Sequence, residues 1–446
     1  MTNDPKTPDA LIVGRLLADP DRPAEPGWLT IRDGFIDNLG HGPPPAEVAD
    51  LPRLGGRTRV ISPAFTDAHT HLPQVDSVGC DGLELLDWLH RVIFPAETWW
   101  GHAGSMPMAR RAVRSMLENG AAAFAGYLSS HAEPNAAVLR WLAAATPMRY
   151  ICGRSAMDRD APDELTDEDR RRRTMSPTPA PVLPVRDADG PAPRGLATGL
   201  RARMPSAIPR FAISCTDELL AELGWWIADH QRRTGAWVQT HLAESPGEIE
   251  RTRALFPDDP SYTAVYDRFG LLNDRTLLAH CIHLADDEWA LLRERRAVVV
   301  HCPTANTFLQ AGLFDLDAAE RHGVRLALGS DVAGGPDAAM PRVARAMIEV
   351  AKVRRLAARD RGEPHDHIRV PTPADAWRLI TETNARELGW TDMGRLEPGA
   401  SATLLVLHPP EVWLDEHLVG RLIYNWSPEL IEHLLVGGAP ASPATI

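Results

Sequence analysis

Ile-Ser-Pro-Ala-Phe-Thr-Asp-Ala-His-Thr-His-Leu-Pro-Gln, residues 61 to 74, is the stretch on which both the fold and the chemistry of this chain depend. An apolar run leads there into His69 and His71. Because side chains two residues apart on a β-strand point to the same face, the two imidazoles would converge on one point. A metal ion requires that of two of its ligands, although two polar residues on a half-exposed strand would give the same pattern.

Seven further short apolar runs follow, and helical patterns separate them. The runs cover residues 121–127, 148–152, 210–215, 236–241, 276–280, 297–302 and 325–331. Helices are expected at residues 108–118, 216–231, 245–255, 285–295 and 316–322. This alternation predicts a parallel α/β sheet, and eight strands favour a closed, TIM-like (β/α)8 barrel. A doubly wound sheet is the weaker interpretation, because no Gly-x-Gly-x-x-Gly follows any strand.

Short strands at both ends of the chain predict a second, smaller β unit. Residues 10–40 alternate around Asp33-Gly34, which is a hairpin signal, and further strands are expected at 402–408 and 434–438. Strands from the two termini are expected to pair beside the barrel. The predicted division is residues 1–61 and 396–446 for this small β-sandwich and residues 62–395 for the barrel.

The candidate catalytic residues follow the C-terminal ends of the apolar runs. They are His69, His71, His241, Glu244, His280, His301 and Asp331. In a barrel these positions open onto one rim, where the active sites of this fold are found. Three histidines and a carboxylate would suit zinc, and Glu244 is the best candidate for a proton-transferring carboxylate outside the metal shell. Blander interpretations remain: His301 would close the top of the barrel, and Asp331 would cap a helix.

Composition narrows the class of protein. A net charge of -13 argues against a nucleic-acid partner, which would select a basic face. The five cysteines are scattered and form no Cys-x-x-Cys motif, so a reduced cytoplasm is expected rather than a disulfide framework. The first ten residues do not resemble a signal peptide, and no apolar run is long enough for a membrane span. Residues 159–195 are first charged, with an arginine run at 170–173 that is expected to be a solvated helix end. The proline-rich stretch that follows, through residues 184–193, predicts a surface loop or lid over the barrel mouth.

Several motifs resemble those of the amidohydrolase superfamily and, more narrowly, those of the guanine deaminases. The broader motifs are His69-Thr70-His71, Thr240 to Glu244, Ala279-His280, His301-Cys302-Pro303 and Gly329-Ser330-Asp331. The narrower ones are His69 to Gln74, Trp88-Leu89, Phe94 to Glu97, Pro209 to Phe211 and Asp331 to Gly335. The match runs in order from residue 61 to residue 355. Residues 394–406 also resemble the returning C-terminal strand of the family.

The resemblance implies a zinc-dependent hydrolysis of guanine to xanthine and ammonia, on a barrel with a small β-sandwich built from both termini. One zinc ion per chain, with Fe²⁺ as the alternative, would be held by His69, His71, His241 and Asp331. The catalytic residues would be Glu244, His280 and Asp331. The purine would be bound by Gln74, Arg210, Phe211, His71, His241, Glu244 and Asp331. The family usually forms dimers, so a homodimer is expected.

The same resemblance implies a role for each catalytic residue. His280 would orient the attacking water, Asp331 would take its proton, and Glu244 would carry a proton to a ring nitrogen. Two other functions stay open. One is the same reaction on another aminated ring, such as 8-oxoguanine, a pterin or an s-triazine. The other is a non-catalytic barrel that serves as a scaffold, which would be expected to have lost the ligands that are present here.

Overall fold

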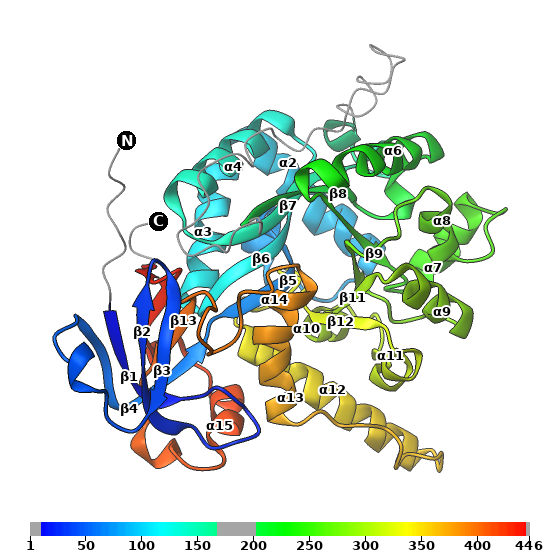
Figure 1. The fold of residues 1–446 in the computed structure, drawn as a ribbon. Coiled ribbons are helices and arrows are strands. Elements are labelled where there is room, and N and C mark those ends of the chain that lie inside the picture. The colour runs from blue at the N-terminus through cyan, green and yellow to red at the C-terminus, as the bar shows by residue number, and fades with distance from the viewer. Residues whose placement is uncertain (1–9, 167–201, 443–446) are drawn as a thin grey trace.

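The computed structural model describes residues 10–166 and 202–442, which form two sheets and the helices around them. Figure 1 shows the strands from both ends of the chain side by side, next to a larger ring of strands and helices. The arginine run at residues 170–173 and the proline-rich stretch that is predicted to be a surface loop or lid both lie outside the described residues. No helix in the described part of the chain is long and apolar enough for a membrane span.

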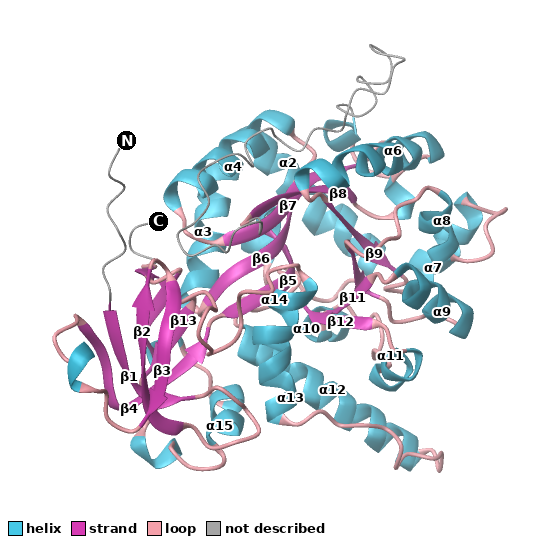
Figure 2. Cartoon of the chain, in the orientation of Figure 1, coloured by secondary structure: helices cyan, strands magenta, loops and turns pink. Residues whose placement is uncertain are grey.

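The larger sheet has eight parallel strands that follow one another in chain order, from β5 to β12. They are β5 (Phe65–His71), β6 (Ala121–Leu128), β7 (Arg149–Ala156), β8 (Arg203–Pro209), β9 (Trp237–Leu242), β10 (Thr276–His280), β11 (Val298–His301) and β12 (Arg325–Leu328). Figure 2 shows helices around the outside of these strands. One apolar cluster draws buried residues from all eight strands, so side chains fill the barrel interior.

The helices between the barrel strands agree with the predicted ones to within a few residues. Those up to β10 are α1 (Leu85–Trp88), α2 (Phe94–Trp99), α3 (Ser105–Glu118), α4 (Ala132–Ala145), α6 (Asp217–Thr234), α7 (Pro246–Leu255) and α8 (Tyr262–Arg268). After β10 come α9 (Asp286–Arg295), α10 (Pro303–Phe308), α11 (Leu316–His322), α12 (Met340–Asp360), α13 (Pro373–Arg378), α14 (Asn384–Glu387) and α15 (Leu418–Tyr424). Helix α7 begins with a capping box, in which Ser245 and Glu248 satisfy each other's backbone N–H groups.

The smaller sheet has seven strands in the order β15-β14-β13-β4-β1-β2-β3, so both termini contribute to it. They are β1 (Ala10–Leu16), β2 (Glu25–Arg32), β3 (Phe35–His41), β4 (Arg53–Pro63), β13 (Leu404–Leu407), β14 (Ile431–Val436) and β15 (Ala439–Pro440). Asp33 and Gly34 form the predicted hairpin turn, with φ of 50° and 86°. The predicted fold class, a (β/α)8 barrel with a small β unit from both ends, is confirmed.

One predicted strand is wrong. Residues 210–215 form a loop and a short 3₁₀ turn, and the barrel strand is β8, which ends at Pro209. Pro205 and Pro209 interrupt the apolar run of β8, and a proline cannot donate a backbone hydrogen bond, so the strand does not read as one. The shift places Arg210 at the rim, directly after a strand end.

The buried Asn384 joins the first and last barrel strands, which are not neighbours in the hydrogen-bonded strand order. Its Nδ2 donates to the carbonyl oxygens of Thr66 and Leu328 at 2.7 and 2.8 Å. Its Oδ1 accepts from the N–H of Leu328 at 2.9 Å. One side-chain amide therefore satisfies three buried backbone groups at the seam of the barrel.

Asn384→Ala is expected to lower the free energy of unfolding by about 3 kcal/mol, because three buried backbone groups lose their partner. Urea denaturation would measure this change. Asn425→Ala is the matched control, since Asn425 is exposed and its side chain donates to one backbone carbonyl among the described residues, that of Arg421. It should cost under about 0.5 kcal/mol. Equal losses in the two variants would show that Asn384 does not hold the seam.

Candidate active site

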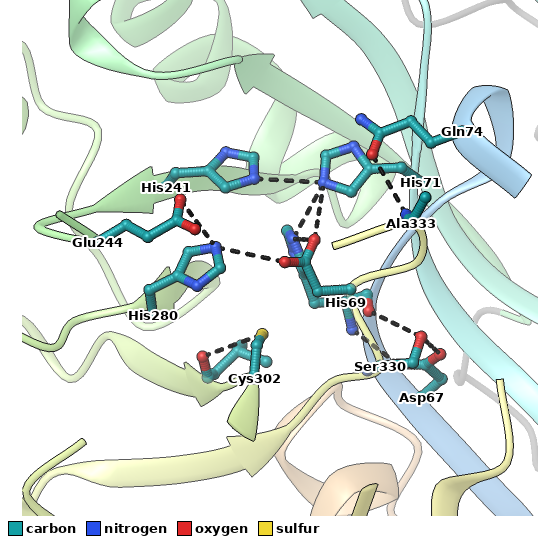
Figure 3. Close-up of polar contacts among 12 residues, drawn as sticks. Asp67, His69, His71, Gln74, His241, Glu244, His280, Cys302, Ser330 and Ala333 are labelled. Carbon is teal, nitrogen blue, oxygen red and sulfur yellow. Dashed lines mark hydrogen bonds and ion pairs between the residues drawn. The ribbon is translucent and has the colours of Figure 1, made fainter. Parts of the chain in front are cut away.

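The candidate residues meet at the C-terminal ends of the barrel strands (Figure 3). His69 and His71 end β5, His241 lies on β9, and His280 ends β10. Asp331 follows β12 after two residues. His280 and Asp331 adopt left-handed backbone conformations, with φ of 73° and 49°. For residues other than glycine this costs about 1–3 kcal/mol, and such strain is characteristic of functional sites.

Four of these side chains direct ligand-type atoms at one another. The Nε2 atom of His71 lies 3.2 Å from that of His69 and 3.2 Å from that of His241. Oδ1 of Asp331 lies 3.1 Å from Nε2 of His69 and 3.3 Å from Nε2 of His71. The ligands of a tetrahedral zinc ion with Zn–N bonds near 2.05 Å are separated by about 3.3 Å. The observed separations therefore match a tetrahedral metal shell.

His280 also lies close enough to the cluster to be considered as a metal ligand. The ligand atoms of His69, His241, His280 and Asp331 all lie within 4.8 Å of one another. Nε2 of His280 is 3.7 Å from Asp331 Oδ2 and 3.4 Å from Glu244 Oε2. We favour His71 as the fourth ligand, because its contacts with three of the ligand atoms are the shorter ones.

Hydrogen bonds behind the imidazoles fix their tautomers. His241 donates from Nδ1 to the carbonyl of Arg210 at 2.6 Å, and His280 donates from Nδ1 to Oδ1 of Asn306 at 2.8 Å. Both acceptors are oxygens without a proton, so each ring carries a hydrogen on Nδ1 and, in its neutral form, has its lone pair on Nε2. Nε2 is the atom that faces the centre, which is the arrangement seen in metal-binding histidines.

The charge states also suit a cation. Burial lowers the pKa of His71 to about 4, and burial together with the neighbouring histidines holds the pKa of His241 well below its usual value. These rings are therefore neutral near pH 7. Burial opposes ionisation of Asp331, but hydrogen bonds from His69 and His71 hold its pKa well below the usual range. Neutral imidazoles and an ionised carboxylate are the forms that bind metals.

Glu244 faces this cluster from the loop after β9 and is buried. Burial, followed by repulsion from Asp331 and Glu248, raises its pKa well above the usual value for a carboxyl group. Its Oε1 has no hydrogen-bond partner among the described residues. A protonated carboxyl group with a free oxygen beside a metal-type cluster is suited to deliver a proton.

A narrow cavity lies against these residues. Its polar lining consists of His71, Gln74, Arg210, His241, Glu244, His280 and Asp331. Its apolar lining consists of Leu85, Trp88, Leu89, Phe211 and Leu309. The structure therefore places Gln74, Arg210 and Phe211, together with the predicted catalytic residues, around one space. His69, whose Nε2 lies 3.2 Å from that of His71, is not part of the lining.

Glu97 is a neighbour of this site that the sequence did not single out. Its Oε1 accepts from Gln74 Nε2 at 3.1 Å and from Nη1 of Arg210. In the sequence, its motif Phe-Pro-Ala-Glu carries only the family resemblance and no sign of a role in the site. Asn306, which holds His280, was also missed, because neither residue follows a strand end.

His301 lies outside the cavity lining, although it ends a barrel strand as His280 does. Its ring stacks on Phe314 with centroids 4.5 Å apart, and neither ring nitrogen has a hydrogen-bond partner in the described part of the chain. Burial lowers the pKa of His301 to about 3. The blander interpretation of His301, as a packing residue, agrees with these contacts.

Known proteins are similar to this chain in sequence and in fold. Guanine deaminase from Escherichia coli is 29% identical over 419 residues, which is 92% of this chain and 87% of that protein. Guanine deaminase from Dictyostelium discoideum is 34% identical over 279 residues, which is 62% of this chain and 58% of that protein. The crystal structure of guanine deaminase from C. acetobutylicum with bound guanine superposes with a TM-score of 0.81 at 22% identity, covering 97% of this chain and all of the other.

A family model also matches most of the chain. The model of the amidohydrolase family aligns with residues 60–438, which include both histidines of β5, the other predicted ligands and Glu244. The aligned region begins in β4 of the smaller sheet and ends after β14, so it covers the barrel together with its flanking strands. The chain belongs to the amidohydrolase family.

Proposed function

We propose that the chain hydrolyses guanine to xanthine and ammonia. One observation carries this proposal: three of the four residues of the metal-type cluster, the buried Glu244 and the purine-binding candidates Gln74 and Arg210 all line one cavity. The similarity to proteins named guanine deaminase supports the choice of substrate. A non-catalytic barrel that served only as a scaffold would not need these ligands and this carboxylate around one cavity.

The proposed metal ligands are His69, His71, His241 and Asp331, whose atoms, separations and charge states suit one zinc ion. Fe²⁺ accepts the same nitrogen and oxygen donors, so iron is the alternative metal. The chemistry that such an ion supplies is activation of water, whose pKa falls to about 7 on coordination.

The protein side chains would perform the proton transfers. His280 and Asp331 would orient the attacking water, and Asp331 would accept a proton from it. Glu244, whose raised pKa keeps it protonated, would donate to the ring nitrogen beside the aminated carbon. Water oxygen replaces the amino nitrogen at that carbon. The amino nitrogen would take from Asp331 the proton that Asp331 accepted from the water and leave as ammonia, and the second proton of the water would return to Glu244.

Recognition of the ring would rest on Arg210, Gln74 and Phe211. An arginine N–H donates to a ring carbonyl, and the Gln74 amide can both donate and accept. Phe211 and the apolar walls, including Trp88 and Leu309, would cover the flat faces of the ring. A carbonyl separated from an aminated carbon by one ring nitrogen, as in guanine, matches this set of groups.

The test is ammonia release from a panel of aminated rings by the zinc-loaded protein. We expect release from guanine, its loss after chelation, and its recovery on adding zinc. The panel would include 8-oxoguanine, a pterin and an s-triazine. Release from one of these and none from guanine would show that the substrate is wrong, whereas only traces of bound metal in the purified protein would favour the scaffold.

We also propose the assembly and location expected for such an enzyme: a cytoplasmic homodimer whose domains are residues 62–395 for the barrel and residues 1–61 with 396–446 for the β-sandwich. Support for the compartment comes from the five cysteines, all of which are free, four of them buried. Light scattering of the purified protein would test the dimer.

A further inference from the structure

Glu97 lies behind the active-site cavity rather than on its wall. It belongs to α2, is 1% exposed, and is absent from the cavity lining. Both residues that it contacts, Gln74 and Arg210, do line the cavity. Glu97 can therefore affect a bound ring through these two side chains without contacting it.

The first consequence concerns the orientation of the Gln74 amide. Nε2 of Gln74 donates to Glu97 at 3.1 Å, and Oε1 accepts from the N–H of Ala333 at 3.3 Å. A carboxylate oxygen only accepts and a backbone N–H only donates, so the amide cannot be flipped without losing both bonds. Gln74 is thereby held in one orientation, with one N–H and one lone pair left for a ligand.

The second consequence concerns charge. Arg210 and Glu97 form an ion pair whose side chains are 3% and 1% exposed, and Arg210 lies over the ring of Phe94 at 5.5 Å. A buried charge without a partner attracts any available counter-ion strongly, because little solvent screens it. With Glu97 present, Arg210 offers directed N–H groups but little net charge to the cavity.

We infer that Glu97 is a positioning and specificity-determining residue, which fixes Gln74 and Arg210 and makes the cavity select uncharged amino-oxo rings over anionic ones. This inference rests on the proposed function for the identity of the ring. It goes beyond that function in explaining why an arginine in the cavity would not prefer an anion.

A buried ion pair can also serve stability alone, and the chain contains a matched example. The side chains of Arg149 and Asp392 are 2% and 6% exposed, and two N–H groups of the arginine donate to the two carboxylate oxygens at 2.6 and 2.7 Å. Neither residue lines the cavity. Asp392→Asn removes the same charge as Glu97→Gln. If both pairs were only structural, both variants would lower the melting temperature and leave ligand selectivity unchanged.

The experiment compares neutral guanine with urate, a ring that is anionic near pH 7, on the zinc-loaded wild-type, Glu97→Gln and Asp392→Asn proteins. For Glu97→Gln we expect KM for guanine to rise about tenfold while kcat changes less than about threefold. The ratio of the urate inhibition constant to the guanine KM should fall at least tenfold. Glu97→Asp should restore this ratio partly, and Asp392→Asn should leave it at the wild-type value.

Dissociation constants from calorimetry keep this inference separate from the proposed function, since they need no turnover. If the wild-type protein did not turn over guanine, but Glu97→Gln still changed the ratio of the urate and guanine dissociation constants, only the proposed reaction would be refuted. A Glu97→Gln protein with unchanged selectivity would refute the inference. Should that variant not fold, Arg210→Gln decides, because it leaves Glu97 unopposed and must shift the ratio against urate; an unchanged ratio there would refute the inference as well.

Discussion

Glu244→Gln is expected to lower kcat by at least about a hundredfold and to leave the metal content unchanged. Positioned general acids and bases contribute 10²–10⁴-fold, and an amide of the same shape cannot transfer the proton. Glu244 contacts His280, at 3.4 Å, and we place His280 outside the metal shell. The substitution should therefore leave the metal ligands in place. Steady-state rates of ammonia release and metal analysis of the same preparation would measure both effects.

Glu288→Gln is the matched control for this prediction. Glu288 is also a buried glutamate, but it accepts from Thr263 and Ala285 at the start of α9, away from the cavity lining. We expect it to reduce stability while kcat stays within about twofold of wild type. Wild-type turnover by Glu244→Gln, or an equal loss in both variants, would contradict the proton-transfer role of Glu244.

The barrel and most of its rim could be predicted because both follow from local patterns. Apolar runs alternate with helical ones, and the C-terminal ends of parallel strands must meet on one side. His241, His280 and Asp331 each follow such a run, so their convergence required no knowledge of long-range contacts. His69 and His71 needed only the two-residue period of a strand.

The parts that sequence reasoning missed depend on contacts between distant segments. Glu97 reads as one acidic residue in a helix, and only the fold brings it to Gln74 and Arg210, 23 and 113 residues away. The position of β8 could not be predicted because its prolines are atypical of a barrel strand. The run after β8 looked like a strand, yet it forms the loop on which Arg210 reaches the cavity.

The sequence motifs assign His71 to the metal shell, whereas one group of neighbouring ligand atoms contains His280 instead. His71→Ala would distinguish the two. We expect this variant to bind zinc at least about a hundredfold more weakly, because replacing even an outer-shell partner costs 10–100-fold. Turnover should be lost with the metal. His280→Ala should instead retain the metal and lose turnover, since Nε2 of His280 is 3.7 Å from Asp331 whereas that of His71 is 3.3 Å away.

His301→Ala provides the matched control for both histidine variants. His301 is equally buried at the end of a barrel strand, but it packs against Phe314 and does not reach the cavity. The His301→Ala protein should keep its zinc, as measured by elemental analysis after dialysis and by competition with a coloured chelator. If His280→Ala lost the metal while His71→Ala kept it, His280 would be the fourth ligand. The orientation of water would then pass to His71, and the shell proposed from the 3.1–3.3 Å separations would be wrong.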